Sequence, residues 1–391
     1  MLNTPFSPWP SFTEDEANAV RDVILSNRVN YWTGEECRGF EQEFAAWCGT
    51  RHAVAVANGT VALDLALHAL SVGDGDEVIV TSRTFLASVS SVVLAGATPV
   101  FVDVDRDSQN ITADGIASAI SSRTKAIICV HLAGWPCDMD PIMQLAAEHG
   151  LKVIEDCAQA HGARYKGRAV GSIGHIGAWS FCQDKVMTTG GEGGMVTTDD
   201  PDLWASMWAY KDHGKDWKTV YEHQHPPGFR WLHASFGTNW RMLEVQAVLG
   251  RLQLKKMTTW SEVRVANARK IWSCAESFKA LRVPKVPADC THAAYKCYVF
   301  VEPQFLKEGW NRDRIISSLV ELEVPCFSGS CSEVYLEKAF DNTSFRPSVR
   351  LPIAKELGEC SLMFLVHPTL TESNMRKTCE ALTEVMLEAS R

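Results

Sequence analysis

A regular alternation of short β-branched runs with helical patterns is the feature that most constrains the fold of this chain. Between residue 52 and about residue 200, strand-like runs such as HAVAVA, DEVIVT, TPVFVDV, KAIICVH and KVIEDCA alternate with helical patterns, and GAWSF and GGMVTT indicate two further strands. This alternation is typical of an α/β domain with a largely parallel sheet and helices on both faces. Ligands of such sheets bind at the carboxyl ends of the strands, which is where candidate site residues are expected.

The remainder of the chain predicts a second, smaller unit. Residues 214–238 interrupt the alternation with aromatic residues, histidines and a double proline. A long irregular segment in a compact domain is usually functional, disordered or an interface element, and the aromatic content argues against disorder. A helical pattern from about Leu243 to Phe278 follows, and the strands KCYVFVE and SLMFLVHP come after it. We predict a large α/β domain over residues 1–250, and a connecting helix with a small C-terminal α/β domain over residues 251–391.

Composition argues against several classes of function. The 391 residues include 38 Lys and Arg against 47 Asp and Glu, a net charge of −9 without a basic stripe, which argues against nucleic-acid binding. The sequence shows neither a membrane-spanning apolar run nor a signal-peptide pattern. The 13 cysteines contain no CxxC pair, so we expect reduced thiols and a cytoplasmic location. His223 and His225 have no third ligand nearby, and no metal site is predicted.

The first candidate site residues follow the strand HAVAVA. Asn58, Gly59 and Thr60 stand where a helix begins, and the free amides of a helix N-terminus beside a hydroxyl can hold a phosphate. The alternative is that Asn58 or Thr60 only caps the helix.

A second group follows the strand KVIEDCA. Asp156 ends this strand, and Gln159 and His161 lie just beyond it. A carboxylate at the end of a buried strand needs a cationic partner or a network of donors. Asp156 therefore belongs either to a ligand site or to an ion pair that fixes the following loop.

The third candidate is Lys185, in SFCQDKVMTTGGEGG between the strand GAWSF and a run of glycines. A lysine there is either a surface residue or an amine that bonds an aldehyde, and the glycines let the backbone approach a ligand closely. Together, a phosphate cup, a strand-end carboxylate and a strand-end lysine are the groups that pyridoxal 5′-phosphate requires for its phosphate, ring nitrogen and aldehyde.

Five motifs in order extend this hypothesis to nearly the whole chain: NGTVAL, EDCAQAHGA, SFCQDK…GEGG, GTNWRM and SLMFLVHP. With them the sequence resembles the DegT/DnrJ/StrS family of sugar aminotransferases, fold-type-I pyridoxal-phosphate enzymes, from about Asn30 to the C-terminus. The resemblance implies that Lys185 bonds the cofactor covalently and that Asp156 pairs with its ring nitrogen. It further implies cofactor contacts for Gly59, Thr60 and Ser180 at the phosphate, Phe85 on the ring, Gln159 near the 3′-oxygen, and Asn239 at the phosphate of the other subunit.

The last of these contacts implies a homodimer with shared active sites. The aromatic residues of segment 214–238 would then be buried anchors and substrate walls, namely Trp217, Tyr221, Phe229 and Trp231. The alternative is a segment packed on its own subunit, with Asn239 as a helix cap.

The implied reaction moves an amino group, most simply from L-glutamate, to a keto-sugar that is most often nucleotide-linked, in the biosynthesis of amino sugars for a surface polysaccharide or a glycosylated metabolite. Four alternatives stay open: a sugar dehydratase, which replaces the lysine by histidine; an aminocyclitol transaminase; a cysteine desulfurase that uses Cys326 or Cys331; and a regulator without turnover. The sequence departs from the family pattern in TTGGEGG, TGEECRGFE and CFSGSCSEVY. We expect the last two stretches to face the substrate.

Overall fold

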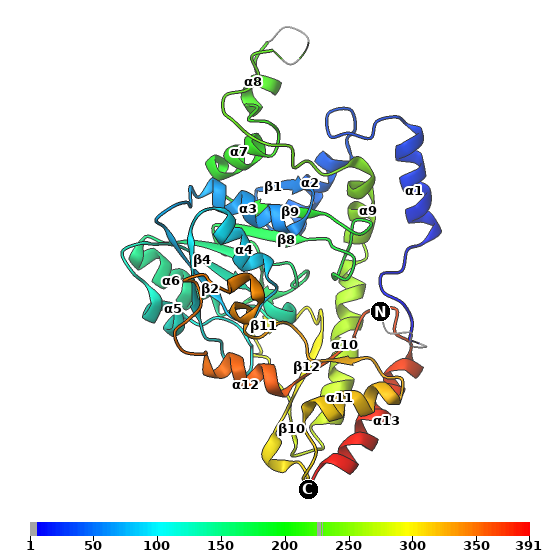
Figure 1. Ribbon diagram of the computed structural model, residues 1–391. Helices are drawn as coiled ribbons and strands as arrows, with labels where there is room; N and C mark the ends of the chain where they lie inside the picture. The colour runs from blue at the N-terminus through cyan, green and yellow to red at the C-terminus, as the bar shows by residue number, and fades with distance from the viewer. Residues whose placement is uncertain (1–5, 225–227, 229) are drawn as a thin grey trace.

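A seven-stranded sheet forms the centre of the larger part of the molecule. A computed structural model describes residues 6–224, 228 and 230–391 (Figure 1). The strands, in spatial order, are β1 (His52–Val56), β9 (Gly194–Thr198), β8 (Ile176–Ser180), β5 (Lys152–Asp156), β4 (Thr124–Val130), β2 (Glu77–Thr81) and β3 (Thr98–Val102). From β8 to β3 all neighbours pair in parallel, whereas β9 is antiparallel to both β1 and β8. The largely parallel sheet predicted from the alternation is confirmed.

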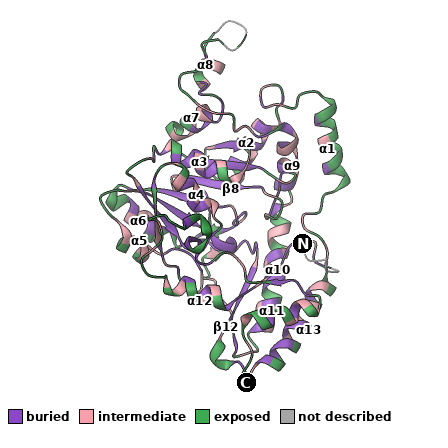
Figure 2. Cartoon of the chain, in the orientation of Figure 1, coloured by how far each residue is buried: buried purple, intermediate pink, exposed green. Residues whose placement is uncertain are grey.

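Helices pack on both faces of this sheet, as Figure 1 shows. They are α2 (Glu36–Cys48), α3 (Gly59–Ala69), α4 (Ala87–Leu94), α5 (Ala113–Ala119), α6 (Met139–His149) and α7 (Pro201–Tyr210). Successive side chains of a strand point to opposite faces, so Ile127 packs with Val153 in one core and Ile128 packs with Ile154 in another. Because both faces are covered, most strand residues are buried, and Figure 2 shows the strands inside a shell of half-exposed helices.

A four-stranded antiparallel sheet forms the centre of the C-terminal part. Its order is β10 (Leu281–Arg282), β12 (Cys297–Val301), β14 (Ser361–Phe364) and β13 (Cys326–Phe327). The helices of this part are α10 (Met257–Ala275), α11 (Arg312–Glu321), α12 (Pro352–Cys360) and α13 (Glu372–Ala389). A small sheet of β11 (Cys290–Thr291), β6 (Arg164–Tyr165) and β7 (Arg168–Ala169) joins residues from both parts of the chain. Single-turn helices lie at η1 (Leu132–Gly134), η2 (Pro303–Phe305), η3 (Val334–Leu336) and η4 (Lys338–Phe340).

The prediction of one long helix from Leu243 to Phe278 is wrong. The structure has α9 (Glu244–Leu254) and α10, with a break at Lys255 and Lys256. At the break the Lys256 ammonium lies 2.9 Å from the buried carboxylate of Glu16, which belongs to the N-terminal helix α1 (Glu14–Leu25). This contact joins segments far apart in the chain, so helical periodicity does not reveal it. The predicted domain border at 250/251 falls inside α9 and stays a prediction.

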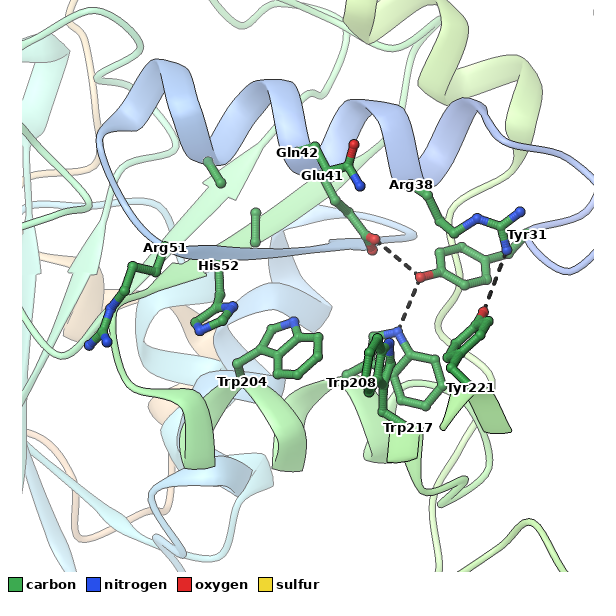
Figure 3. A pocket seen from close by; sticks show the side chains of 12 residues that line it. Tyr31, Arg38, Glu41, Gln42, Arg51, His52, Trp204, Trp208, Trp217 and Tyr221 are labelled. Atoms are coloured by element: carbon green, nitrogen blue, oxygen red, sulfur yellow. Dashed lines mark hydrogen bonds between the residues drawn. The ribbon is translucent and has the colours of Figure 1, made fainter. Parts of the chain in front are cut away.

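The first part of segment 214–238 packs on helix α7 of its own chain through aromatic side chains. Figure 3 shows Trp204 and Trp208 of α7 facing Trp217 and Tyr221 of the short helix α8 (Trp217–Tyr221). The ring centres of Trp204 and Trp217 are 5.7 Å apart, and those of Trp217 and Tyr221 are 5.2 Å apart. These side chains line a cavity of about 270 Å³ between α2 and α7, at whose base Tyr31 donates a hydrogen bond to Glu41 (3.1 Å).

The rest of segment 214–238 differs from this attached part. The side chains of Trp231 and Phe236 are 85% and 99% exposed, respectively. Phe229 and His225 lie outside the described residues. Trp217 and Tyr221 therefore pack on their own chain, as in the alternative, whereas Trp231 has no such packing.

Two further observations bear on the environment of the protein. All 13 cysteines are free thiols, as expected from their spacing. Among the described residues, no helix is both long and apolar enough to cross a membrane. The cytoplasmic location stays a prediction.

Candidate active site

A cavity of about 890 Å³ lies at the carboxyl ends of β1, β5 and β8, where residues of the small C-terminal sheet meet them. Seven of the eight residues that the resemblance implies for the cofactor line it: Gly59, Thr60, Phe85, Asp156, Gln159, Ser180 and Lys185. Asn239 does not line the cavity of its own chain. The expectation that the three strand-end motifs converge is therefore met, although they are up to 126 residues apart.

The N-terminus of α3 forms one wall of the cavity. The side chain of Asn58 caps this helix by accepting a hydrogen bond from the amide of Val61 (3.0 Å), so the capping alternative is correct for Asn58. The amides of Gly59 and Thr60 donate to no acceptor among the described residues. A Cβ atom on Gly59 would lie 2.4 Å from the Cβ of Ser180, so only glycine allows this close approach. Free helix amides beside hydroxyls suit a phosphate group.

Asp156 is a nearly buried carboxylate that lacks a cationic partner. Its side chain is 5% exposed, and it accepts hydrogen bonds from the hydroxyl of Ser88 (2.7 Å) and the amide of Ala158 (3.1 Å). Within the described chain no lysine, arginine or histidine forms an ion pair with it, so the alternative of a loop-fixing ion pair is not found there. A buried carboxylate costs free energy unless a cation pairs with it. The carboxylate of Asp156 faces the cavity, where a cationic group of a ligand could pair with it.

The contact from Ser88 was not found by sequence reasoning. Ser88 belongs to α4, four residues after Thr84, and the two hydroxyls are 2.8 Å apart. The stretch TSRTFLAS contains both, but nothing in its pattern shows that its last serine reaches the end of β5.

Lys185 is a half-buried lysine that lines the cavity without a carboxylate partner among the described residues. Its ammonium lies 5.3 Å from the ring centre of Tyr295, whose hydroxyl donates a hydrogen bond to the carboxylate of Asp184. Its backbone carbonyl accepts a hydrogen bond from the indole nitrogen of Trp9 (2.8 Å). The loop is thus held from two sides, and the amine is left for a ligand in the cavity.

Phe85 and Gln159 each leave a group open to the cavity: the aromatic ring of Phe85 and the side-chain amide nitrogen of Gln159. The ring of Phe85 lines the cavity and is 70% exposed, which suits an aromatic side chain that stacks on a flat ligand. Gln159 accepts a hydrogen bond from the amide of Ala133 (2.8 Å), while its amide nitrogen has no acceptor among the described residues.

Tyr295 and Lys296 also line the cavity, and sequence reasoning missed both. Burial raises the pKa of the Tyr295 phenol well above its ordinary value, and Asp184 raises it further. Burial lowers the pKa of Lys296 to about 8. Both residues immediately precede β12, which the sequence predicted only as an apolar strand.

The two stretches expected to face the substrate differ in their position. From CFSGSCSEVY, Phe327, Gly329, Ser330 and Cys331 line the cavity. No residue of TGEECRGFE lines this cavity within one chain, and the expectation that it faces the substrate stays a prediction. The stretch forms the start of α2 instead, where the amide of Cys37 donates a hydrogen bond to the carboxylate of Glu244 (3.3 Å).

The thiols of this region do not suit a cysteine desulfurase. Burial raises the pKa of Cys326 to about 12, and burial with the nearby carboxylate of Glu337 raises the pKa of Cys331. A nucleophilic cysteine needs the opposite shift, because the thiolate is the reactive form.

Comparison with known proteins shows the family of this chain. The model of the DegT/DnrJ/EryC1/StrS aminotransferase family matches residues 10–383. GDP-perosamine synthase of Caulobacter vibrioides is 37% identical over 94% of this chain and 95% of its own length. UDP-N-acetyl-3-dehydro-alpha-D-glucosamine 3-aminotransferase of Acidithiobacillus ferrooxidans is 35% identical over 94% of this chain and 95% of its own. The crystal structure of an aminotransferase from Psychrobacter cryohalolentis superposes with a TM-score of 0.97 at 64% identity, over 98% of this chain and 99% of that one.

The fold and the matches define an α/β enzyme with the fold-type-I architecture of pyridoxal-phosphate-dependent transferases. The chain belongs to the DegT/DnrJ/EryC1/StrS aminotransferase family, and it is a sugar aminotransferase. The resemblance inferred from the five motifs is confirmed.

Proposed function

We propose that this aminotransferase binds pyridoxal 5′-phosphate in the 890 Å³ cavity and moves an amino group from L-glutamate to a nucleotide-linked keto-sugar. One observation carries the proposal: Asp156 and Lys185, which have no ion-pair partner among the described residues, line one cavity with the free helix amides of Gly59 and Thr60. These groups match the protonated ring nitrogen, the aldehyde and the phosphate of the cofactor. The bound cofactor supplies an electron sink for the carbanion that transamination requires.

Asp156 would keep the ring nitrogen protonated, because a neighbouring carboxylate favours the cationic form. Ser88 and the amide of Ala158 hold this carboxylate in place. Phe85 would cover one face of the ring and exclude water from it. The amine of Lys185 would accept the proton from the α-carbon of the donor in the first half-reaction, and its protonated form would donate a proton to the acceptor carbon in the second.

The acceptor is proposed from the relatives and from the size of the site. The two relatives are named for a GDP-linked and a UDP-linked sugar, so the names support a nucleotide-linked sugar but not one nucleotide. The cavity is at the upper end of the range for small-molecule sites and accommodates a sugar beside a cofactor. Phe327, Ser330 and Cys331 form the wall on the side of the C-terminal sheet. The product would serve amino-sugar biosynthesis for a surface polysaccharide or a glycosylated metabolite.

A homodimer with shared sites is part of the proposal. Asn239 is exposed, forms a backbone bridge to Asp212, and is not the cap of α9, which begins after Leu243. It is therefore available to complete the phosphate site of a second copy. Exposed Trp231 and Phe236 in the same segment would become buried at that interface. Of the alternatives, the dehydratase would need a histidine in place of Lys185.

The test is a panel of nucleotide-linked keto-sugars, each incubated with L-glutamate and the cofactor. We expect one or a few members to gain an amino group by mass spectrometry, with an equal amount of 2-oxoglutarate formed. Lys185→Ala is the matched control and should form neither product. If no keto-sugar on the panel is aminated while the protein still converts glutamate to 2-oxoglutarate in a single turnover, the sugar part of the proposal is wrong.

A further inference from the structure

The described residues that line the cavity include three acidic side chains but only two cationic ones. Among the described lining residues, the acidic side chains are Asp156, Asp184 and Glu192, and the cationic ones are Lys185 and Lys296. Lys185 is assigned to bond the cofactor and to transfer a proton. L-glutamate carries two carboxylates into this cavity, so the second lysine is the cation of this chain that remains to bind one of them.

The position of Lys296 suits that task. Its ammonium lies 4.8 Å from the ring centre of Tyr295, and the ammonium of Lys185 lies 5.3 Å from the same ring centre. Lys296 is half-buried, as Lys185 is, and it forms no ion pair or hydrogen bond with the described residues. Partial burial of an ammonium without a partner costs free energy, which a bound anion offsets.

The pKa of Lys296 reflects the free-energy cost of partly burying its charge. Burial lowers its pKa to about 8; the charge of Asp184 opposes this shift, whereas Arg264 and Lys185 add to it. An anion bound beside Lys296 would therefore stabilise its charged form.

We infer that Lys296 binds a carboxylate of the amino donor. This inference rests on the proposed transamination and names a residue for its first substrate. The diphosphate of a nucleotide-linked sugar has related chemistry, but the sugar ring separates it from the carbon that reacts. The carboxylates of the donor are a few bonds from the carbon that reacts beside Lys185, and Lys296 shares an aromatic neighbour with that lysine.

The test compares Lys296→Met, which keeps the length of the side chain without its charge, with Lys296→Arg, which keeps a cation. The half-reaction with glutamate and the half-reaction with the keto-sugar are measured separately by rapid mixing. Loss of a charge-assisted hydrogen bond predicts a Kd for glutamate about 10- to 100-fold higher in Lys296→Met. We expect Lys296→Arg to recover most of that affinity and the KM for the keto-sugar to stay unchanged in both variants. Lys285→Met, which removes an exposed lysine, is the matched control.

A second measurement does not depend on turnover. Glutarate, a dicarboxylate without an amino group, is titrated into the cofactor-free protein by calorimetry. We expect it to bind the wild type and Lys285→Met equally, and Lys296→Met about 10-fold more weakly or worse. Equal binding to wild type and Lys296→Met, or no binding to the wild type, overturns the inference.

The two half-reactions separate this inference from the proposed function. A rise in the KM for the keto-sugar with unchanged Kd for glutamate would assign Lys296 to the diphosphate and overturn the inference. If the wild type does not react with glutamate at all, the proposed donor is wrong, and glutarate binding still decides whether Lys296 holds a carboxylate.

Discussion

The indole nitrogen of Trp9 donates a hydrogen bond to the backbone carbonyl of Lys185 at 2.8 Å, across 176 positions of the chain. The indole itself is held by the rings of Trp260 and His367, at centre distances of 5.1 and 5.9 Å, and by the guanidinium of Arg264 at 4.9 Å. The N-terminal segment thus contacts the backbone of the loop that carries Lys185, the lysine proposed to bond the cofactor.

Trp9→Phe should separate this positioning role from simple packing. The variant keeps an aromatic ring but loses the donor, and loss of one such hydrogen bond costs about 1 kcal/mol of stability. We expect the protein to fold and keep its cofactor, with kcat lowered about 3- to 10-fold because Lys185 is held less firmly. Steady-state kinetics and thermal unfolding measure both effects. An unchanged kcat with a lowered Tm would show that Trp9 only stabilises the fold.

Asp156→Asn should nearly abolish transamination without unfolding the protein. The amide has almost the same shape, so Ser88 and the amide of Ala158 keep a neighbour. An amide does not hold a proton on the cofactor ring, and we expect kcat to fall by about two orders of magnitude or more. Single-turnover kinetics with glutamate measure the rate, and circular dichroism serves as the control for folding. A near-normal rate would mean that Asp156 is structural.

Ser88→Ala should lower kcat less than Asp156→Asn does. It removes one hydrogen bond to Asp156 but leaves the carboxylate, so we expect a loss of about 10-fold or less in kcat. A loss as large as that of Asp156→Asn would give Ser88 a role of its own.

Subunit exchange tests whether Asn239 serves the site of a second copy. A chain with Lys185→Ala is mixed with a chain with Asn239→Ala under conditions that allow exchange. If the sites are shared, one site of the hybrid carries both lesions and the other carries neither, so activity should rise above that of either parent. If each site lies within one chain, every hybrid site carries one lesion and no recovery appears.

The use of glutamate should depend on pH through Lys296. Its pKa is lowered to about 8, so the ammonium that would bind a carboxylate is present below that pH and is lost as the pH rises through it. We expect kcat/KM for glutamate to fall above about pH 8 and this descending limb to be absent in Lys296→Met. Bound carboxylate favours the charged form, so the limb should move to higher pH in kcat than in kcat/KM. The same limb in both proteins would assign it to another group.

The sequence by itself determined the architecture and the residues at strand ends. Apolar runs and helical patterns are local, so they indicate where the strands lie, and strands of a parallel sheet end at one edge. This is why Gly59, Thr60, Asp156 and Lys185 could be predicted to line one site, to which the family resemblance added Ser180. The ordered motifs then indicated the family.

Only the tertiary structure decided which distant side chains support that site. Trp9 reaches Lys185, Ser88 reaches Asp156, and Lys296 enters the cavity from the C-terminal sheet. It also separated CFSGSCSEVY, which lines the cavity, from TGEECRGFE, which starts a helix elsewhere. Periodicity reports whether a residue is buried within its own element, but it carries no information on which element packs against it. Those contacts depend on how the two sheets and the N-terminal segment come together, and that is a property of the folded chain.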